Sequence, residues 1–281
     1  MGRVVETGEH SIWSIGQRVV AAPYLHCGAC HYCRNGQPTL CDRLFDISIY
    51  PGGMAEQVFI PAEMASRGLI PVSDGLSSEY AALAEPLGCV IKGIEDSRVK
   101  TGDSVLIIGD GPMGLMAASV AKAYGAFPVI VAGMTPSRLD AARHHFADMV
   151  IDITQSDVEN EVRKFTGGRG ADIVIAAVSL GETVLDAIHC VRPGGVVNAF
   201  AGVPNGTTIP LDIRLLHYKQ LNLTGSFGTA PEHMAKALRL LEHKKVPADA
   251  IVTAIYPFSK IQDAVDHAFQ RQGLKTIITF Y

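Results

Sequence analysis

Residues 105–114 read Val105-Leu106-Ile107-Ile108-Gly109-Asp110-Gly111-Pro112-Met113-Gly114. A run of aliphatic residues precedes the pattern G-x-G-x-x-G, and an alanine-rich stretch follows it. Glycines at these positions allow a tight turn and a close approach of the backbone to a bound group, and the free N–H groups of the next helix face a pyrophosphate. The pattern alone is weak, but the strand–loop–helix context favours dinucleotide binding over a glycine-rich connection without a ligand. The predicted contacts are Gly109, Gly111, Pro112, Met113 and Gly114.

Alternating strand and helix patterns continue outward from this segment. The expected strands are 104–109, 128–132, 149–153, 172–177, 196–201 and 223–227. The expected helices are 113–124, 137–146, 158–165, 183–191 and 233–243. Strands that alternate with helices of this length indicate parallel βαβ units. The sequence therefore predicts the α/β fold class, with a coenzyme domain built on a parallel sheet of the Rossmann type.

The two ends of the chain differ from its middle in their pattern of strand-like and helix-like segments. Residues 1–98 contain short strand-like runs, such as 18–22 and 56–60, between glycines, prolines and turn residues, which is typical of an irregular β domain. The last residues return to short elements, including an amphipathic stretch at 260–269, and we expect them to pack on the first region. The expected parts are 1–98 with a cysteine-rich lobe at 26–43, the coenzyme-binding domain 99–245, and a C-terminal return at 246–281.

Composition excludes several classes of protein. The chain has 281 residues, of which 48% are hydrophobic and 19% charged, so a packed globular protein is expected and disorder is not. With 24 basic and 28 acidic residues the net charge is −4, which provides no basic field for nucleic acid or an anionic membrane. The apolar runs are too short to span a bilayer, and residues 1–6 lack the apolar core of a secretory signal. We expect a soluble cytoplasmic protein with no nucleic-acid or membrane partner.

Four of the six cysteines are clustered with the spacing C-x2-C-x2-C-x7-C. They are Cys27, Cys30, Cys33 and Cys41. Consecutive C-x2-C turns bring sulfur atoms together, and four thiolates satisfy the tetrahedral preference of Zn²⁺. Because four protein ligands leave no open coordination position, such a zinc would be structural. Arg34 and Arg43 could offset its excess negative charge.

Two other interpretations of the cluster remain. Iron–sulfur proteins also use repeated C-x2-C turns, but in ferredoxins the fourth cysteine follows more closely and precedes proline, whereas Cys41 precedes Asp42. Four unliganded thiols are the other alternative. Zinc is the favoured interpretation.

The coenzyme's ribose end is expected about 20 residues beyond the glycine loop. No Asp or Glu occurs between Leu115 and Leu139, and the second strand ends at Gly133. An acid at this position would accept the ribose hydroxyls and repel a 2′-phosphate. Its replacement by glycine removes that repulsion, and donors follow at Thr135, Ser137 and Arg138. This favours NADP over NAD; the alternative is a solvated Arg138 and NAD held by other contacts.

With both motifs present, the sequence resembles the zinc-containing medium-chain dehydrogenases, the alcohol, polyol and threonine dehydrogenase superfamily. The resemblance extends over essentially the whole chain. Besides the cysteine lobe and the glycine loop it includes Val19-Val20, Gly52-Gly53-Met54-Ala55-Glu56, Glu85-Pro86-Leu87, Pro193-Gly194-Gly195 and Gly225-Ser226-Phe227-Gly228. Glu85-Pro86 is more similar to the polyol and sugar dehydrogenases than to alcohol dehydrogenases with a cysteine in the equivalent place.

The resemblance implies a fold, an activity and further site residues. The fold is a chaperonin-like (GroES-like) β domain, here partial and with a structural zinc lobe, joined to a Rossmann domain. The activity is zinc-dependent, NAD(P)-linked hydride transfer between a secondary alcohol, such as a polyol or sugar derivative, and the nicotinamide. Glu85 would be a catalytic residue and zinc ligand, and the assembly a homodimer or homotetramer. The nicotinamide pocket would be lined by Ala177, Val178, Ala201 and Gly202.

The sequence also departs from the family pattern. Family members place an early cysteine and a Gly-His-Glu motif around the catalytic zinc, and both are absent here, which leaves Glu85. We therefore expect a chain without its N-terminal catalytic segment, through a misplaced start codon or a cloned fragment rather than a shortened paralogue, and little turnover. The alternative is a non-catalytic NADP(H)-binding, sensing or assembly protein with one structural zinc. A zinc-free quinone reductase is disfavoured by the cysteine lobe.

Overall fold

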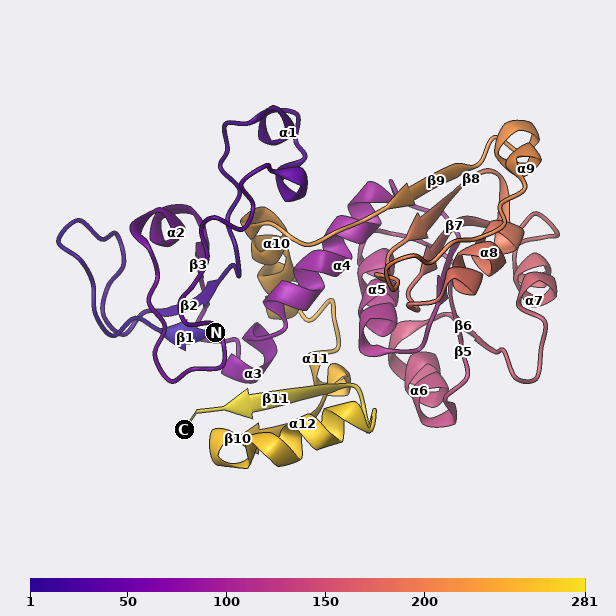
Figure 1. Cartoon of the computed structure of the whole chain (residues 1–281). Coiled ribbons are helices and arrows are strands. Elements are labelled where there is room, and N and C mark those ends of the chain that lie inside the picture. The colour runs from indigo at the N-terminus through magenta and orange to yellow at the C-terminus, as the bar shows by residue number, and fades with distance from the viewer. Residues whose placement is uncertain (281) are drawn as a thin grey trace. The chain divides into compact units, whose positions relative to one another are not determined.

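The structure, a computed structural model, describes residues 1–280. The chain forms two compact units. The first contains residues 1–89, 228–244 and the chain from 252 onward; the second contains residues 90–227 and 245–251. In Figure 1 the first unit includes the indigo N-terminal part and the yellow C-terminal part of the ribbon.

The second unit is built on a six-stranded sheet with the order β6-β5-β4-β7-β8-β9. Its strands are β4 (Val105–Ile108), β5 (Val129–Gly133), β6 (Met149–Asp152), β7 (Ala171–Ala176), β8 (Val191–Ala199) and β9 (Asn222–Gly225). All neighbouring strands are parallel. The chain runs outward from β4 to β6 and then returns to β7 on the other side of β4. This reversal is the switch point at which open α/β sheets bind ligands, and the predicted α/β class is confirmed.

Helices connect these strands in the second unit. They are α5 (Pro112–Ala123), α6 (Pro136–Ala141), α7 (Val158–Phe165), α8 (Gly181–Cys190) and α9 (Ile213–Tyr218); the short helix α11 (Ala248–Ile251) also belongs to this unit but follows the last strand of the sheet. The single helix expected at 137–146 is α6 followed by a π-helical turn, η2 (Ala142–Phe146). Helix α5 packs on β4 and β5, and α8 packs on β7 and β8. Every residue of β4 and β5 is buried, so these aliphatic strands require cover on both faces.

Helix α4 (Ala84–Asp96) was not expected from the sequence, because Pro86, Gly88 and Gly93 disfavour a helix. Packing requires the last glycine, since a Cβ on it would lie 2.7 Å from the Phe200 ring. The fully buried Asn198 side chain also donates to its carbonyl at 3.0 Å. The boundary between the two compact units lies at residue 90, inside this helix, whereas the sequence pattern changes after residue 98.

The first unit contains an antiparallel sheet with the order β1-β2-β3. Its strands are β1 (Gly2–Arg3), β2 (Arg18–Ala21) and β3 (Leu69–Pro71). The strand expected at 56–60 is not formed: Phe59 pairs with Tyr50 alone. Pro51 and two glycines follow Tyr50, and neither residue type extends a ladder well.

The C-terminal part of the first unit is a small βαβ arrangement. Strands β10 (Val252–Pro257) and β11 (Lys275–Thr279) are parallel, and η3 (Phe258–Lys260) and α12 (Ile261–Phe269) lie between them in the chain. The other helices of this unit are α1 (His31–Arg34), η1 (Pro38–Leu40), α2 (Ala62–Arg67), α3 (Ser78–Ala81) and α10 (Pro231–Glu242). Within residues 1–280, no helix combines the length and the apolar character needed to traverse a lipid bilayer.

Asp172 joins the amino-terminal ends of three strands of the large sheet. Its carboxylate accepts hydrogen bonds from the Ser104 N–H and hydroxyl at 2.8 and 2.6 Å, and pairs with Arg192 Nε at 2.5 Å. Burial alone would raise the pKa of Asp172, but the bonds from Ser104 and Arg192 lower it below the ordinary value of 3.8. The ionised form is therefore the one that the fold stabilises.

Replacing this carboxylate should destabilise the fold at neutral pH. A depressed folded-state pKa contributes stability that is present above the unfolded-state pKa and is lost as the pH falls through the folded-state value. Asp172→Asn should lower the free energy of unfolding by about 1–3 kcal/mol at pH 7. The loss should shrink on acidification below pH 4, as measured by urea unfolding. The control is Asp140→Asn, because Asp140 is exposed; equal effects of both variants would contradict the role of Asp172.

Candidate functional site

Two of the three loop glycines are required by the protein itself. Gly109 has a φ of +131°, a conformation that L side chains rarely adopt. Gly114 lies in the first turns of α5, and a Cβ on it would be 2.0 Å from the Gly109 carbonyl oxygen. The two glycines thus allow the end of β4 and the start of α5 to touch.

The third loop glycine, Gly111, is not required by its backbone conformation or by contacts within the protein. It precedes α5 with a φ of −75° and a ψ of 172°, which any residue adopts. A Cβ built on it would have no atom within 4 Å. The space beside it lies at the start of α5, where Pro112 and Met113 begin the helix and backbone N–H groups lack partners within the helix. This geometry fits a bound pyrophosphate.

The other predicted coenzyme contacts lie at the same edge of the sheet. Gly133 ends β5, and Thr135 immediately precedes α6, which carries Arg138 in its first turn. The Ala177 N–H, just after β7, donates to the Ile108 carbonyl at the end of β4 at 2.9 Å.

The remaining predicted pocket residues follow β7 and β8. Val178 lies next to the loop, since a Cβ on Gly109 would be 2.9 Å from its Cγ2. Ala201, which precedes Gly202, donates its N–H to the Ala176 carbonyl at 3.0 Å. The structure therefore gathers all the predicted coenzyme residues at the carboxyl ends of four neighbouring strands, β5, β4, β7 and β8.

Asp110 is a residue of this edge that sequence reasoning missed. Its Oδ2 accepts hydrogen bonds from the Met134 and Thr135 N–H groups at 3.0 and 2.7 Å. The side chain is buried against Gly133. The sequence feature that could have identified Asp110 is an acid inside the glycine loop, followed by a glycine at the end of the next strand.

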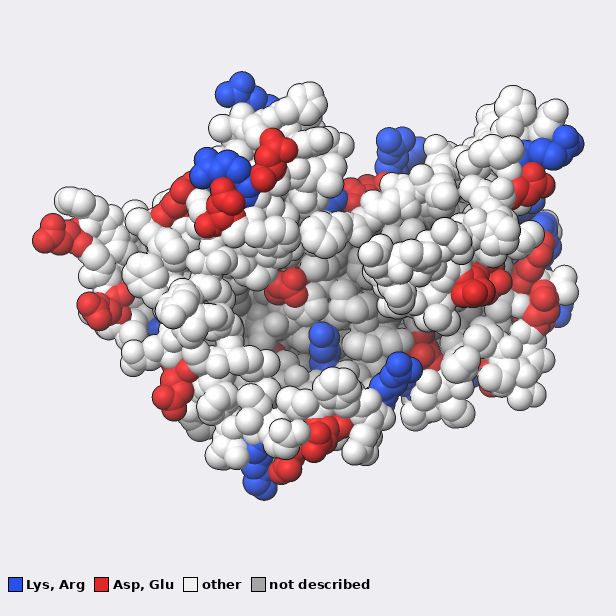
Figure 2. Space-filling view, viewed as in Figure 1, with Lys and Arg blue, Asp and Glu red and all other residues white. Residues whose placement is uncertain are grey.

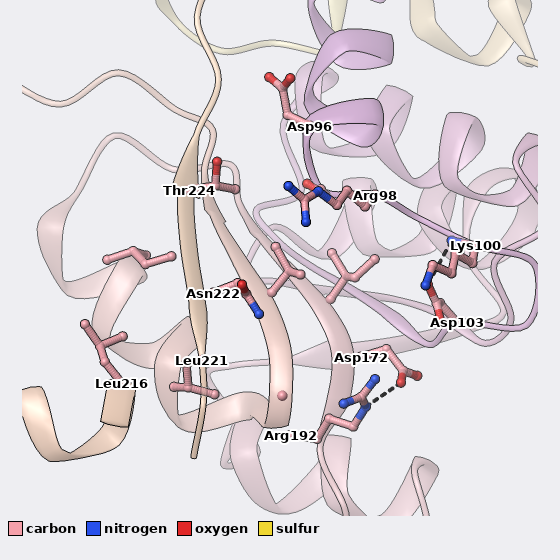
Figure 3. Close-up of a pocket in the computed structure, with 15 residues that line it drawn as sticks. Asp96, Arg98, Lys100, Asp103, Asp172, Arg192, Leu216, Leu221, Asn222 and Thr224 are labelled. Atoms are coloured by element: carbon pink, nitrogen blue, oxygen red, sulfur yellow. Dashed lines mark hydrogen bonds and ion pairs between the residues drawn. The ribbon is translucent and has the colours of Figure 1, made fainter. Parts of the chain in front are cut away.

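A cavity of about 630 Å³ lies at the opposite edge of the sheet. Figure 3 shows Asp172 and Arg192 there, near the amino-terminal ends of β7 and β8, with Asn222 at the start of β9. Asp172 and Arg192 form an ion pair. Because ligands of open α/β sheets bind at the carboxyl ends of the strands, this cavity is not the candidate coenzyme site.

The four clustered cysteines converge in the structure. Helix α1 carries Cys33, and η1 ends immediately before Cys41. The sulfur of Cys33 lies 4.0 Å from that of Cys27 and 3.5 Å from that of Cys30, and all four sulfur atoms lie within 4.8 Å of one another. Four sulfurs around Zn²⁺ at 2.3 Å would be separated by about 3.8 Å. The donor set fits one tetrahedral zinc.

Backbone N–H groups surround these sulfur atoms. The N–H groups of Ala29 and Cys30 donate to the Cys27 sulfur, and those of Cys27 and Arg43 donate to the Cys41 sulfur. The backbone N–H of Cys33, with that of Asp42, lowers the pKa of Cys30 to about 6. Hydrogen bonds to the charged form favour the thiolate of Cys30, whereas desolvation and the neighbouring Cys30 side chain raise the pKa of Cys33 to about 12.

Three arginines lie in or near the lobe. Arg43 pairs its guanidinium with Asp46 at 2.8 Å, which together with the charge of Cys27 raises the pKa of Arg43, whereas no ion pair of Arg34 is found among residues 1–280. Arg67 also lies against the lobe, with a hydrogen bond of 3.1 Å to the His26 carbonyl. Figure 2 shows basic and acidic side chains side by side in this part of the visible face.

Glu85 lies apart from the cysteines, in the first turn of α4. Its Oε1 accepts a hydrogen bond from the Cys89 sulfur at 3.4 Å. Burial, with the neighbouring Glu85 charge, raises the pKa of Cys89 to about 12, so this thiol keeps its proton. In the described part of the chain the four clustered cysteines form the one group of three or more metal-ligating side chains. The role of Glu85 as a ligand or catalytic residue stays a prediction.

Two protein families match the chain. Residues 1–74 match the family described as "Alcohol dehydrogenase GroES-like domain", and residues 112–243 match "Zinc-binding dehydrogenase". These matches confirm the predicted GroES-like domain beside the Rossmann sheet.

Similar proteins of known identity agree with these families. Sorbitol dehydrogenase from Bacillus subtilis is 31% identical over 95% of this chain and 75% of its own length. L-galactonate-5-dehydrogenase from Escherichia coli is 31% identical over 94% and 76%. The solved alcohol dehydrogenase TADH from a Thermus species is 28% identical with a TM-score of 0.88, covering 99% and 82% of the two chains.

A further solved structure contains a coenzyme. This zinc-binding dehydrogenase from Sinorhizobium meliloti, bound to NADP, is 25% identical with a TM-score of 0.89, covering 99% of this chain and 81% of its own. Sequence identity, coverage and fold thus agree. The chain belongs to the zinc-containing medium-chain dehydrogenase superfamily, which comprises alcohol and polyol oxidoreductases.

Proposed function

We propose that the chain is an NAD(P)-linked oxidoreductase of the class that transfers hydride between a secondary alcohol and a nicotinamide coenzyme, and that its own turnover is low because its described residues complete no catalytic metal site. A polyol or sugar derivative is the proposed substrate class. Glu85-Pro86 supports this class, as do the relatives named for sorbitol and L-galactonate. The bound coenzyme would supply the hydride acceptor or donor.

The open space beside Gly111 is the observation that carries this proposal. Neither its backbone angles nor its neighbours require glycine, so the missing side chain serves the approach of something outside the protein. The N-terminus of α5 stabilises negative charge through its free N–H groups and its dipole. We assign the pyrophosphate to this position. The nicotinamide would then reach the residues after β7 and β8, where Ala177, Val178, Ala201 and Gly202 would line its pocket.

NADP is the proposed coenzyme in preference to NAD. The strand β5 ends in Gly133 rather than in an acid, and the Asp110 carboxylate beside it accepts hydrogen bonds from the N–H groups of Met134 and Thr135. Hydroxyl and guanidinium donors follow at Thr135, Ser137 and Arg138. The related Sinorhizobium meliloti dehydrogenase binds NADP.

One structural zinc in the cysteine lobe completes the proposal. The sulfur separations and the N–H donors around them support four thiolate ligands, which leave no coordination position for a substrate. Glu85 is the proposed catalytic carboxylate, but its neighbour Cys89 is a proton donor, and the described residues around it do not complete a second metal site. We derive no step through a catalytic zinc. A homodimer or homotetramer is also proposed, and the six free cysteines favour the reducing cytoplasm.

The described residues contain one cluster of metal-ligating side chains, and this favours one alternative function. A coenzyme-binding protein without turnover would need the Rossmann sheet and the structural zinc but no catalytic metal. Such a protein would sense NADP(H) or act in an assembly.

Alanine at Gly111 should separate coenzyme binding from folding. Because a Cβ at this position meets no protein atom, Gly111→Ala should keep the wild-type unfolding midpoint. It should weaken NADP(H) binding roughly tenfold or more, since the backbone can no longer approach the pyrophosphate. Calorimetry and thermal unfolding measure the two effects.

The matched variant is Gly114→Ala. Its Cβ would collide with the Gly109 carbonyl, so it should lose about 1–3 kcal/mol of stability as well as binding. Unchanged NADP(H) affinity of Gly111→Ala, with wild-type binding intact, would contradict the assignment of the pyrophosphate.

Removing one cysteine should remove the zinc. Cys41→Ser should reduce the zinc content of the purified chain from one to near zero per chain and lower its unfolding midpoint, because metal binding is coupled to the folding of the lobe. Mass spectrometry of the metal measures this. Cys190→Ser is the control, since Cys190 is buried in the second unit, away from the cluster. Zinc retained by Cys41→Ser, or iron in the wild-type chain, would refute the site.

The purified chain should turn over slowly. We expect sorbitol-dependent NADP reduction near the background rate, because the described residues around Glu85 do not complete a catalytic zinc site. Absorbance at the reduced-nicotinamide band measures the rate, with calorimetric NADP binding as the control for an intact coenzyme site. Robust turnover with one zinc per chain would refute this expectation.

A further inference from the structure

Gly133 at the end of β5 is glycine because of one neighbour. Its φ lies outside the positive region, so its backbone conformation would accept a side chain. A Cβ built on it would, however, lie 2.5 Å from the Cβ of Asp110 and 2.6 Å from its Cγ and Oδ2. These are the three nearest atoms, and all belong to Asp110. The side chain of Asp110 occupies the volume into which a side chain at position 133 would project.

Asp110 is held in this volume by the turn that it contacts. Its Oδ2 accepts the N–H groups of Met134 and Thr135, and only 8% of the residue is exposed. A buried carboxylate is costly without such partners, so the position of this side chain is well determined. These two hydrogen bonds occupy the N–H groups at the start of the turn between β5 and α6.

We propose that Asp110 is a positioning residue that determines the coenzyme preference, an inference that rests on the proposed NADP-linked function. By filling the volume beside Gly133, it excludes the ribose-binding acid with which this position would select NAD. By binding the N–H groups of residues 134 and 135, it leaves recognition of a 2′-phosphate to the side chains of Thr135, Ser137 and Arg138. Coenzyme preference is then a property of the pair 110 and 133.

This arrangement distinguishes two substitutions at position 110. The nearest atom to a side chain at 133 is the Cβ of Asp110, at 2.5 Å. Alanine at 110 retains that atom, whereas glycine removes it. Only glycine at 110 should therefore admit an acid at 133.

The experiment compares three variants: Gly133→Asp, the double variant Gly133→Asp with Asp110→Ala, and the double variant Gly133→Asp with Asp110→Gly. Calorimetry measures the binding of 2′,5′-ADP and 5′-AMP, which represent the adenosine ends of NADP and NAD. Thermal unfolding without ligand measures the loss of stability that the collision at position 133 causes. Gly133→Asp alone and with Asp110→Ala should lower the unfolding midpoint by roughly 5 °C and weaken both fragments. Combined with Asp110→Gly, it should match the midpoint of Asp110→Gly alone. That double variant should favour 5′-AMP over 2′,5′-ADP by about tenfold.

A control variant tests whether the volume or the charge of the Asp110 side chain sets the coenzyme preference. Asp110→Asn keeps the size of the side chain and can still accept a hydrogen bond. Its ratio of affinities for the two fragments should stay within about twofold of wild type, and a shift of about tenfold would mean that the carboxylate charge sets the preference.

Other outcomes are also decisive. Wild-type stability of Gly133→Asp alone, or equal rescue by alanine and glycine at 110, would overturn the proposal. If the wild-type chain binds neither fragment, the proposed function fails and the specificity role fails with it. The unfolding midpoints still decide whether Asp110 excludes a side chain at 133.

Discussion

The close approach of the Gly109 carbonyl to Gly114 is the contact on which the functional architecture depends. It allows the last residue of β4 to touch the first turns of α5, so the helix begins directly above the centre of the sheet. The chain reverses between β4 and β7, and the loops after β5, β7 and β8 therefore collect around the same point. A site at this point receives free N–H groups from α5 and backbone from three neighbouring loops.

Two aspartates at opposite edges of the sheet are stabilised in the same way, by hydrogen bonds to their carboxylates. Asp172 binds Ser104 and Arg192 at the amino-terminal ends of its strands, whereas Asp110 binds two N–H groups at the carboxyl ends. Each is a largely buried charge whose cost is offset by directed hydrogen bonds. The first joins strands and bears on stability. The second shapes the turn beside the proposed ribose site and bears on specificity.

The cysteine lobe depends on local structure to a greater degree. Its four sulfurs come from one short segment, and the N–H groups that favour the thiolate of Cys30 belong to the same segment. Metal binding there can order the lobe without participating in hydride transfer. Glu85 has different surroundings, because the half-buried Cys89 thiol keeps its proton and donates to the carboxylate. The two sites therefore differ in chemistry as well as in place.

The sequence by itself determined the features that depend on neighbours along the chain. The aliphatic runs of β4 and β7, the glycine loop and the cysteine spacing are local patterns. The parallel sheet, the placement of the proposed coenzyme residues at one edge and the convergence of the four sulfurs could therefore be predicted. Helix α4, strand β3 and the missing strand at 56–60 could not, because packing or pairing with distant residues overrides local propensity there. Only the tertiary structure decided why position 133 is glycine: the reason is the side chain of Asp110, which chain folding brings within 2.5 Å of it.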